Sequence, residues 1–270
     1  MKNTQFVPMI GVATVLWAGF LTWKSTDSMP KQISVGEHSL RVLVQGQGSP
    51  AVVFETFGAG FLEHMNKVEP HIRRFTTTVV YDHAGAWGSE PGPKPRDANQ
   101  IARELHTLLK KSDVSPPYLL VGFSFGGPYV RVFADRYPEN VAGLVLVDPT
   151  QESFMSWLRE SWPEVNVLTE AQRREQTEWG SQWVSMNQAS NAVLPNVPMV
   201  LLTGMKTGDS VFARHVKPRW LSAHQEWLTK YPNALHIVTT NSGHGIPMSE
   251  PELVVEAINH VFDEAKVARE

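Results

Sequence analysis

An apolar segment that ends in Gly-x-Ser-x-Gly constrains the fold of this chain more than any other feature. Residues 118–121 are an apolar run typical of a buried strand, and residues 128–137 have the pattern of a following helix. Between them the sequence Gly-Phe-Ser-Phe-Gly at positions 122–126 predicts a sharp strand-to-helix turn. Glycines suit such a turn because a side chain would collide with the nearby backbone. The pattern also occurs as a plain turn, so the partners of Ser124 decide whether it is an exposed nucleophile.

Apolar segments rich in valine and leucine alternate with helical patterns along most of the chain. The residues that join the first two strands are too few for anything but an antiparallel hairpin. Elsewhere, strands that are apolar on both faces and alternate with helices predict an α/β fold, a mostly parallel sheet with helices on both faces. We expect strands at residues 32–35, 40–44, 51–54, 77–81, 118–121, 142–147, 198–202 and 235–239, and helices at 62–75, 98–111, 128–137, 211–230 and 250–268.

One interval is too long for a simple crossover between strands. Residues 150–195 lie between the expected strands at 142–147 and 198–202 and have enough pattern to predict a helical cap insertion. The interval is rich in aromatic side chains: Trp157, Trp162, Trp179 and Trp183. Each could simply pack the cap onto the body, but together they suggest an apolar pocket.

Composition excludes several classes of function. The 270 residues are 42% hydrophobic, which is enough for one large domain over residues 32–270. The net charge is -3 and there are no long charged runs, so the sequence does not indicate a basic surface that would bind nucleic acid. Cysteine is absent and no His-Glu-x-x-His spacing occurs, so we expect neither a metal nor a cofactor.

The N-terminal segment is a separate unit over residues 1–31. Residues 6–23 carry no charge and are flanked by Lys2 and Lys24, which is long enough for a single membrane-spanning helix. Bulky residues stand where a cleavage site would need small ones, so an uncleaved anchor is favoured over a cleaved export signal. We expect a protein that is membrane-anchored, or exported if this segment is removed.

A hydrolytic serine needs an imidazole base and a carboxylate that orients it. His244 follows the last expected strand and can reach the edge of the sheet at which Ser124 opens. His83, at another strand end, is its rival. The order serine, acid, histidine allows both Asp209, after the strand at 198–202, and Asp148, after the strand at 142–147. We prefer Asp209, since Asp148 could instead cap the loop that opens the cap.

Two backbone amides are needed to stabilise the negative charge that develops on a carbonyl oxygen. The amide of Phe125, directly after the serine, is the first candidate. The glycine-rich loop after residues 51–54 supplies the second, with Gly58 preferred and Phe57 as the alternative.

With these residues in place, residues 32–267 resemble the α/β-hydrolase family. Residues 81–90 are similar to the family's Asp-Arg-x-Gly-x-Gly-x-Ser turn; here they read Tyr-Asp-His-Ala-Gly-Ala-Trp-Gly-Ser-Glu. Residues 137–148 are similar to the family's segment that ends the helix after the nucleophile and forms the next strand. The resemblance implies an eight-stranded sheet with the second strand antiparallel, and a triad filled by Ser124, Asp209 and His244. Two positions depart from the family: Thr56-Phe57 replaces the usual His-Gly, and Phe123 replaces a histidine.

These observations predict a serine hydrolase that cleaves carboxylic esters of small or medium apolar substrates through an acyl-serine intermediate. A carbon–carbon or amide bond hydrolase with the same triad is an alternative, because the fold does not fix the substrate. A catalytically silent member that binds a hydrophobic ligand is another, motivated by Phe57 and Phe123. Intact Ser124 and His244 argue against silence.

Overall fold

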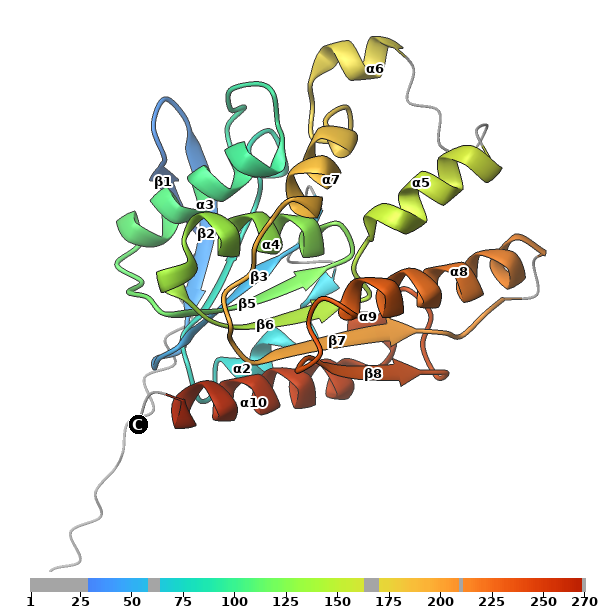
Figure 1. Cartoon of the computed structure of the whole chain (residues 1–270). Coiled ribbons are helices and arrows are strands. Elements are labelled where there is room, and N and C mark those ends of the chain that lie inside the picture. Colours follow the sequence, from blue (N-terminus) through green and yellow to red (C-terminus); the bar gives the residue numbers. More distant parts are fainter. Residues whose placement is uncertain (1–28, 58–63, 163–169, 209–210, 269–270) are drawn as a thin grey trace, which may run out of the picture.

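An eight-stranded sheet forms the centre of the computed structural model, which describes residues 29–57, 64–162, 170–208 and 211–268 (Figure 1). The strand order is β1-β2-β4-β3-β5-β6-β7-β8, with β2 antiparallel to both neighbours and the other pairs parallel. The predicted fold class is therefore confirmed. The strands are β1 Lys31–Ser34, β2 Ser39–Gln45, β3 Ala51–Glu55, β4 Thr78–Tyr81, β5 Tyr118–Phe123, β6 Val141–Val147, β7 Met199–Gly204 and β8 Leu235–Thr239.

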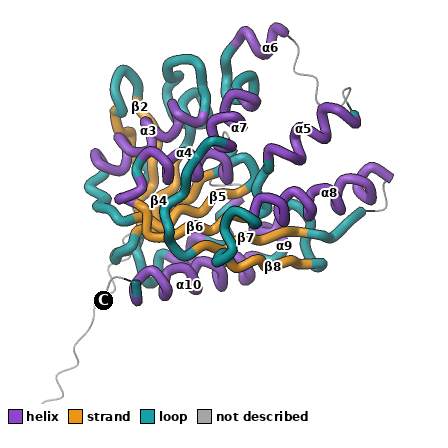
Figure 2. Tube along the Cα trace, viewed as in Figure 1, coloured by secondary structure: helices purple, strands orange, loops and turns teal. Residues whose placement is uncertain are grey.

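The central strands are buried along their whole length because helices cover both faces of the sheet. Side chains alternate between two separate apolar layers. In β5, Leu120 belongs to the layer with α3 and α4, whereas Leu119 belongs to the layer with α10. Figure 2 shows these helices on opposite sides of the strands. The helices outside the cap are α2 Glu69–Ile72, α3 Ala98–Lys111, α4 Gly126–Arg136, α8 Val211–Leu228, α9 Ile246–Ser249 and α10 Pro251–Val267.

The first predicted helix is shorter than expected. The pattern at residues 62–75 predicts a continuous helix, but in its described part the helix is interrupted: residue 64 is helical, residues 65–68 form turns, and α2 spans only Glu69–Ile72. Pro70 lies in the first turn of α2, where its missing N–H costs nothing. A helix running through this position would place the proline in its interior, where the ring clashes with the preceding turn.

The interval between β6 and β7 forms α5 Glu152–Ser161, α6 Glu170–Glu175 and α7 Gln182–Ser190, which project from one side of the sheet (Figure 1). Helix α7 packs on the start of α3, where the hydroxyl of Ser185 accepts a hydrogen bond from the amide of Ala98 at 3.0 Å. Trp157 packs against Trp162, while Trp179 is 51% exposed. We call residues 150–195 the cap, as in the sequence analysis.

The N-terminal anchor predicted at residues 6–23 lies outside the described residues. Within the parts of the chain that the structure describes, no helix combines the length and apolar character needed to cross a membrane.

Candidate active site

Ser124 lies at a strained turn between β5 and α4. Its φ of 55° falls in the left-handed region, which a serine adopts only when the surroundings enforce it. Gly126 makes this turn possible, because a Cβ there would lie 2.1 Å from the carbonyl oxygen of Glu55. Gly122 is equally restricted, since a Cβ would lie 2.7 Å from the side chain of Val130. The two glycines therefore have the role that the sequence predicts for them.

His244 accompanies Ser124 as predicted. It lies in the loop between β8 and α9, and its Nε2 is 2.9 Å from the Oγ of Ser124. The rings of Phe123 and Trp220 contact the imidazole, with centroids 5.2 and 5.7 Å away. The His244 side chain is still 49% exposed, so the site is open to solvent on one side.

Asp148 holds the other side of the imidazole. Its Oδ2 is 2.7 Å from Nδ1 of His244, and its Oδ1 accepts hydrogen bonds from the amide of Gly204 at 2.9 Å and from Nε1 of Trp220 at 2.8 Å. An ionised carboxylate can only accept, so Nδ1 carries the proton and Nε2 presents its lone pair to the hydroxyl of Ser124. This is the tautomer that a general base requires.

The preference for Asp209 over Asp148 is corrected by this geometry. Asp209 lies outside the described residues, and the carboxylate found on His244 is that of Asp148, the alternative. Chain order allowed both acids, but β6 is the direct neighbour of β5 in the sheet. Asp148, which directly follows β6, therefore emerges beside the turn around Ser124 (residues 122–126, the elbow). A hydrogen bond of 3.0 Å from the amide of Thr150 to the carbonyl oxygen of Ser124 ties the two turns together.

His224 lies behind this group and is fully buried. Its Nε2 donates to the carbonyl oxygen of Pro149 at 2.7 Å, and its Nδ1 accepts from the hydroxyl of Thr203 at 2.7 Å, an arrangement that fits the neutral imidazole. Burial lowers the pKa of His224 to about 4, despite the opposing effect of Asp148. From the sequence, His224 is predicted only to lie in the helix at residues 211–230, with no functional role.

The first candidate oxyanion donor lies at the start of α4. Phe125 is the N-cap residue of α4, and amides at a helix start lack partners within the helix and can bind an anion. Gly58, the preferred second donor, lies outside the described residues. Its alternative Phe57 is described, and its ring contacts that of Phe125 with centroids 5.5 Å apart.

His83, the rival base, is not bonded to Ser124. It is 2% exposed, and its two ring nitrogens face two carboxylates: Nε2 is 2.6 Å from Glu55 and Nδ1 is 3.0 Å from Glu178. Burial alone would lower the pKa of His83, but Glu178 and Glu55 outweigh burial and raise it well above its usual range. No sequence motif marks this cluster, because Glu178 is far from Glu55 and His83 in the chain.

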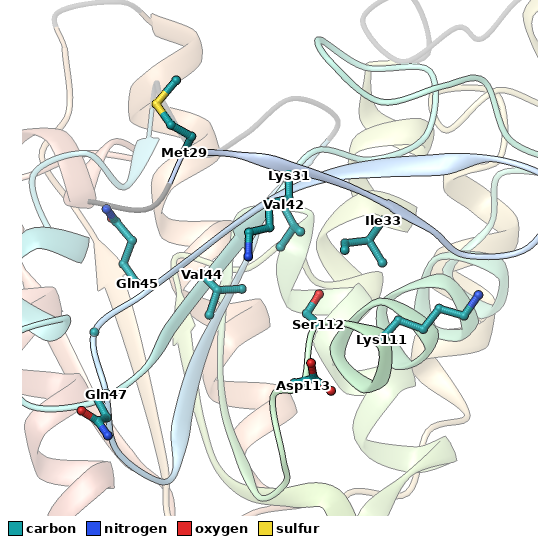
Figure 3. A pocket seen from close by; sticks show the side chains of 11 residues that line it. Met29, Lys31, Ile33, Val42, Val44, Gln45, Gln47, Lys111, Ser112 and Asp113 are labelled. Carbon is teal, nitrogen blue, oxygen red and sulfur yellow. The ribbon is translucent and has the colours of Figure 1, made fainter. Parts of the chain in front are cut away.

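One cavity lies away from the serine. It measures about 540 Å³ beside β1, β2 and the end of α3, and Figure 3 shows Lys31, Lys111 and Asp113 around it. A second cavity of about 260 Å³ is lined by Phe57 on the body and by Thr177, Glu178 and Trp179 on the cap, so it lies where the cap meets the body. The position of this second cavity makes it the better candidate for a substrate group.

Comparisons with known proteins agree with the geometry. The family model described as "alpha/beta hydrolase fold" matches residues 52–229. The uncharacterized protein YqjL of Bacillus subtilis is 27% identical over 220 residues, which cover 81% of this chain and 85% of that protein. Two other curated relatives, from Hormonema carpetanum and Schizosaccharomyces pombe, match over only 20% and 16% of their own lengths.

Two solved structures share the fold. A thermophilic esterase from Thermogutta terrifontis superposes with a TM-score of 0.60 at 19% identity, covering 88% of this chain and 99% of that one. A candidate lipase from Acinetobacter baumannii gives a TM-score of 0.62 at 16% identity, covering 89% and 92%. With the strand order and the family match over most of the sheet, these findings show that the chain belongs to the alpha/beta hydrolase family.

Proposed function

We propose that this hydrolase cleaves carboxylic esters of small or medium apolar substrates through an acyl-serine intermediate. The observation that carries the proposal is the continuous hydrogen-bond chain from Ser124 through His244 to the buried Asp148. The base is then within hydrogen-bond distance of the nucleophile on one side and of the group that orients it on the other.

The reaction follows from the tautomer of His244. Nε2 takes the proton of Ser124 as Oγ attacks the ester carbonyl, and the imidazolium that forms is stabilised by Asp148. The amides of Phe125 and of the 56–58 loop, with Gly58 preferred, bind the oxyanion of the tetrahedral intermediate. His244 then gives its proton to the departing alkoxide, and a water molecule activated in the same way hydrolyses the acyl-serine.

The supports of Asp148 suit this role. Asp148 is fully buried, and a buried charge is costly unless it is fully hydrogen-bonded. Its three donors, His244, Gly204 and Trp220, come from three different elements and fix the direction of both oxygens. The carboxylate is therefore held in one orientation before substrate binds, which is what preorganised catalysis requires.

The surroundings favour neutral, apolar substrate groups. The cavity lined by Phe57 and Trp179 has a mostly apolar surface, with Lys94, Arg96 and Glu178 as its charged lining residues. The ring of Phe57 also contacts that of Phe125, next to the serine. The names of the two structural neighbours, an esterase and a candidate lipase, support ester substrates. For the whole protein we retain the proposal of a single-pass anchor at residues 6–23.

Labelling by a fluorophosphonate probe tests the proposal. Full-length wild-type protein should be labelled at Ser124, and Ser124→Ala should not be labelled at all, because the probe captures an activated serine. Ser190→Ala removes an exposed cap serine and serves as the matched control. A panel of esters and amides with the same acyl group then identifies the bond. Absence of labelling in correctly folded wild-type protein would refute the serine mechanism. If amides were cleaved faster than esters, the protein would be an amide hydrolase and not an ester hydrolase.

A further inference from the structure

His83 joins two segments that are far apart in the chain. Glu55 is the last residue of β3, and Glu178 lies in the cap between α6 and α7. The imidazole lies between them, with Nε2 2.6 Å from Oε1 of Glu55 and Nδ1 3.0 Å from Oε2 of Glu178. We call Glu55, His83 and Glu178 the clasp.

The geometry of the clasp defines its charge. Only the imidazolium can donate from both nitrogens, since a neutral imidazole has one donor and one lone pair. With both nitrogens facing carboxylates, a neutral ring would direct its lone pair at a negative charge. The direction of the pKa shift agrees: burial opposes the charged form, but Glu178 and Glu55 more than offset that effect and raise the pKa of His83.

The clasp runs beside a second connection between cap and elbow. Trp179, next to Glu178, contacts the ring of Phe57 with centroids 5.9 Å apart, and Phe57 in turn contacts Phe125 at 5.5 Å. In the clasp itself, the backbone carbonyl of Glu55 packs directly against Gly126, two residues after Ser124. Both connections therefore end at the segments that carry the candidate oxyanion donors.

We propose that protonated His83 is a positioning residue: it clasps the part of the cap ahead of α7 to the end of β3 and so holds the cavity beside Trp179 and the segment of Phe57 in place. Loss of its proton releases that part of the cap, while α7 stays packed on α3. The catalytic consequence rests on the proposed function, whereas the release of the cap does not.

Two phenols and one guanidinium beside the clasp keep their charge state while His83 titrates. Burial first, and then Glu55 for Tyr81 and Glu178 for Tyr129, raise the pKa of each phenol well above its usual range, so both stay neutral. Arg96 stays cationic in its ion pair with Glu104, which outweighs burial and raises its pKa. The groups from each neighbouring element are Glu55 of β3, Tyr81 of β4, Tyr129 of α4, Glu104 of α3 with His38 against it, Arg96 before α3, and Glu178 of the cap.

The sign of the pH dependence follows from the raised pKa. Below the ordinary value for histidine, His83 is protonated and the clasp is complete. As pH rises through the raised folded-state pKa, a lone pair replaces one donor and repels its carboxylate. The clasp is therefore closed at neutral pH and opens on the alkaline side.

Hydrogen exchange of cap amides in full-length protein tests the proposal without relying on activity. In wild-type protein, exchange around residues 170–182, corrected for intrinsic rates, should rise at least tenfold between about pH 7 and about pH 9.5. Glu178→Gln should abolish this rise, because the amide of glutamine can donate to a neutral imidazole and keep the contact. His83→Gln should expose the cap at both pH values. Glu175→Gln, an exposed cap glutamate, is the matched control and should behave as wild type.

Kinetics supply the second readout. KM for an apolar ester should rise across the same alkaline range in wild-type protein and stay level in Glu178→Gln, whereas a merely structural contact would leave both profiles alike. Equal cap exchange at both pH values in the wild type, or an equal rise in Glu178→Gln, would overturn the clasp. Loss of fluorophosphonate labelling with a pH-dependent cap would instead refute the proposed function and leave the clasp standing.

Discussion

Replacing Asp148 by asparagine is the sharpest test of the candidate site. Asparagine has nearly the same shape, so its oxygen can still accept from Gly204 and Trp220. Its amide nitrogen then faces Nδ1 of His244. Because that nitrogen is a donor, it favours the tautomer that carries the proton on Nε2, which cannot take the proton of Ser124.

The magnitude follows from this change of tautomer. We expect Asp148→Asn to lower kcat by about 10³ to 10⁴-fold, corresponding to about 4 to 5.5 kcal/mol of transition-state stabilisation. The fold should survive, since the shape and two of the three hydrogen bonds are kept. KM for the same ester should change little, because Asp148 is fully buried behind His244 and does not face the substrate.

Steady-state kinetics and the rate of fluorophosphonate labelling should fall together, with the melting temperature confirming that the variant is folded. Asp209→Asn is the control and should retain most of the activity. The reasoning would be refuted if Asp148→Asn were as active as wild type, or if Asp209→Asn alone caused the large loss; the second result would restore Asp209 as the acid.

Other predictions concern the supports of the acid, the stability, the substrate and the anchor. Trp220→Phe removes one donor to Asp148 and should lower kcat about tenfold, with a lower melting temperature because Trp220 is also a buried core residue; unchanged kcat would show that Gly204 alone suffices. Because the pKa of His224 is lowered to about 4, its contribution to stability is complete above about pH 6.5 and should fall by about 3 kcal/mol as pH drops to about 4. Urea unfolding should show this loss in wild type and a flatter profile in His224→Gln, and parallel profiles would contradict it. For esters of increasing acyl length, kcat/KM should rise up to about threefold per methylene at about 0.8 kcal/mol each until the cavity is full, and anionic esters should be poor; a flat series from acetate to octanoate would exclude an apolar acyl pocket. Full-length protein should sediment with membranes and resist salt extraction, whereas a shortened protein that begins at Ser28 should be soluble and active; soluble full-length protein with an intact N-terminus would remove the anchor at residues 6–23.

Ser124 and His244 could be predicted because local sequence marks them. The glycines at 122 and 126 stand two residues on either side of the serine, so the motif is visible in the sequence itself, and the loop after the last strand follows from apolar patterning. The strands follow for the same reason, since burial on both faces selects continuous runs of valine and leucine.

The acid and the clasp depend on distant pairing, which a single sequence does not carry. Asp148 meets His244 only because β6 lies next to β5 and because Gly204 and Trp220 come from the next strand and its helix. Glu178 reaches His83 across a cap whose course no motif predicts. The helix at 62–75 was misjudged for another reason: apolar periodicity outweighed the local effect of Pro70.

The insertion begins directly after the residue that holds His244. Asp148 and Pro149 lie on the body, and the cap leaves from Thr150 and returns at β7, which contributes Gly204. The supports of the acid thus stay with the body, so the cap can be exchanged between about residues 151 and 197 for that of a relative to graft a new substrate preference. Such a chimera needs a carboxylate or amide acceptor at the place of Glu178, because a foreign cap without one would leave the cation of His83 half paired in the interior.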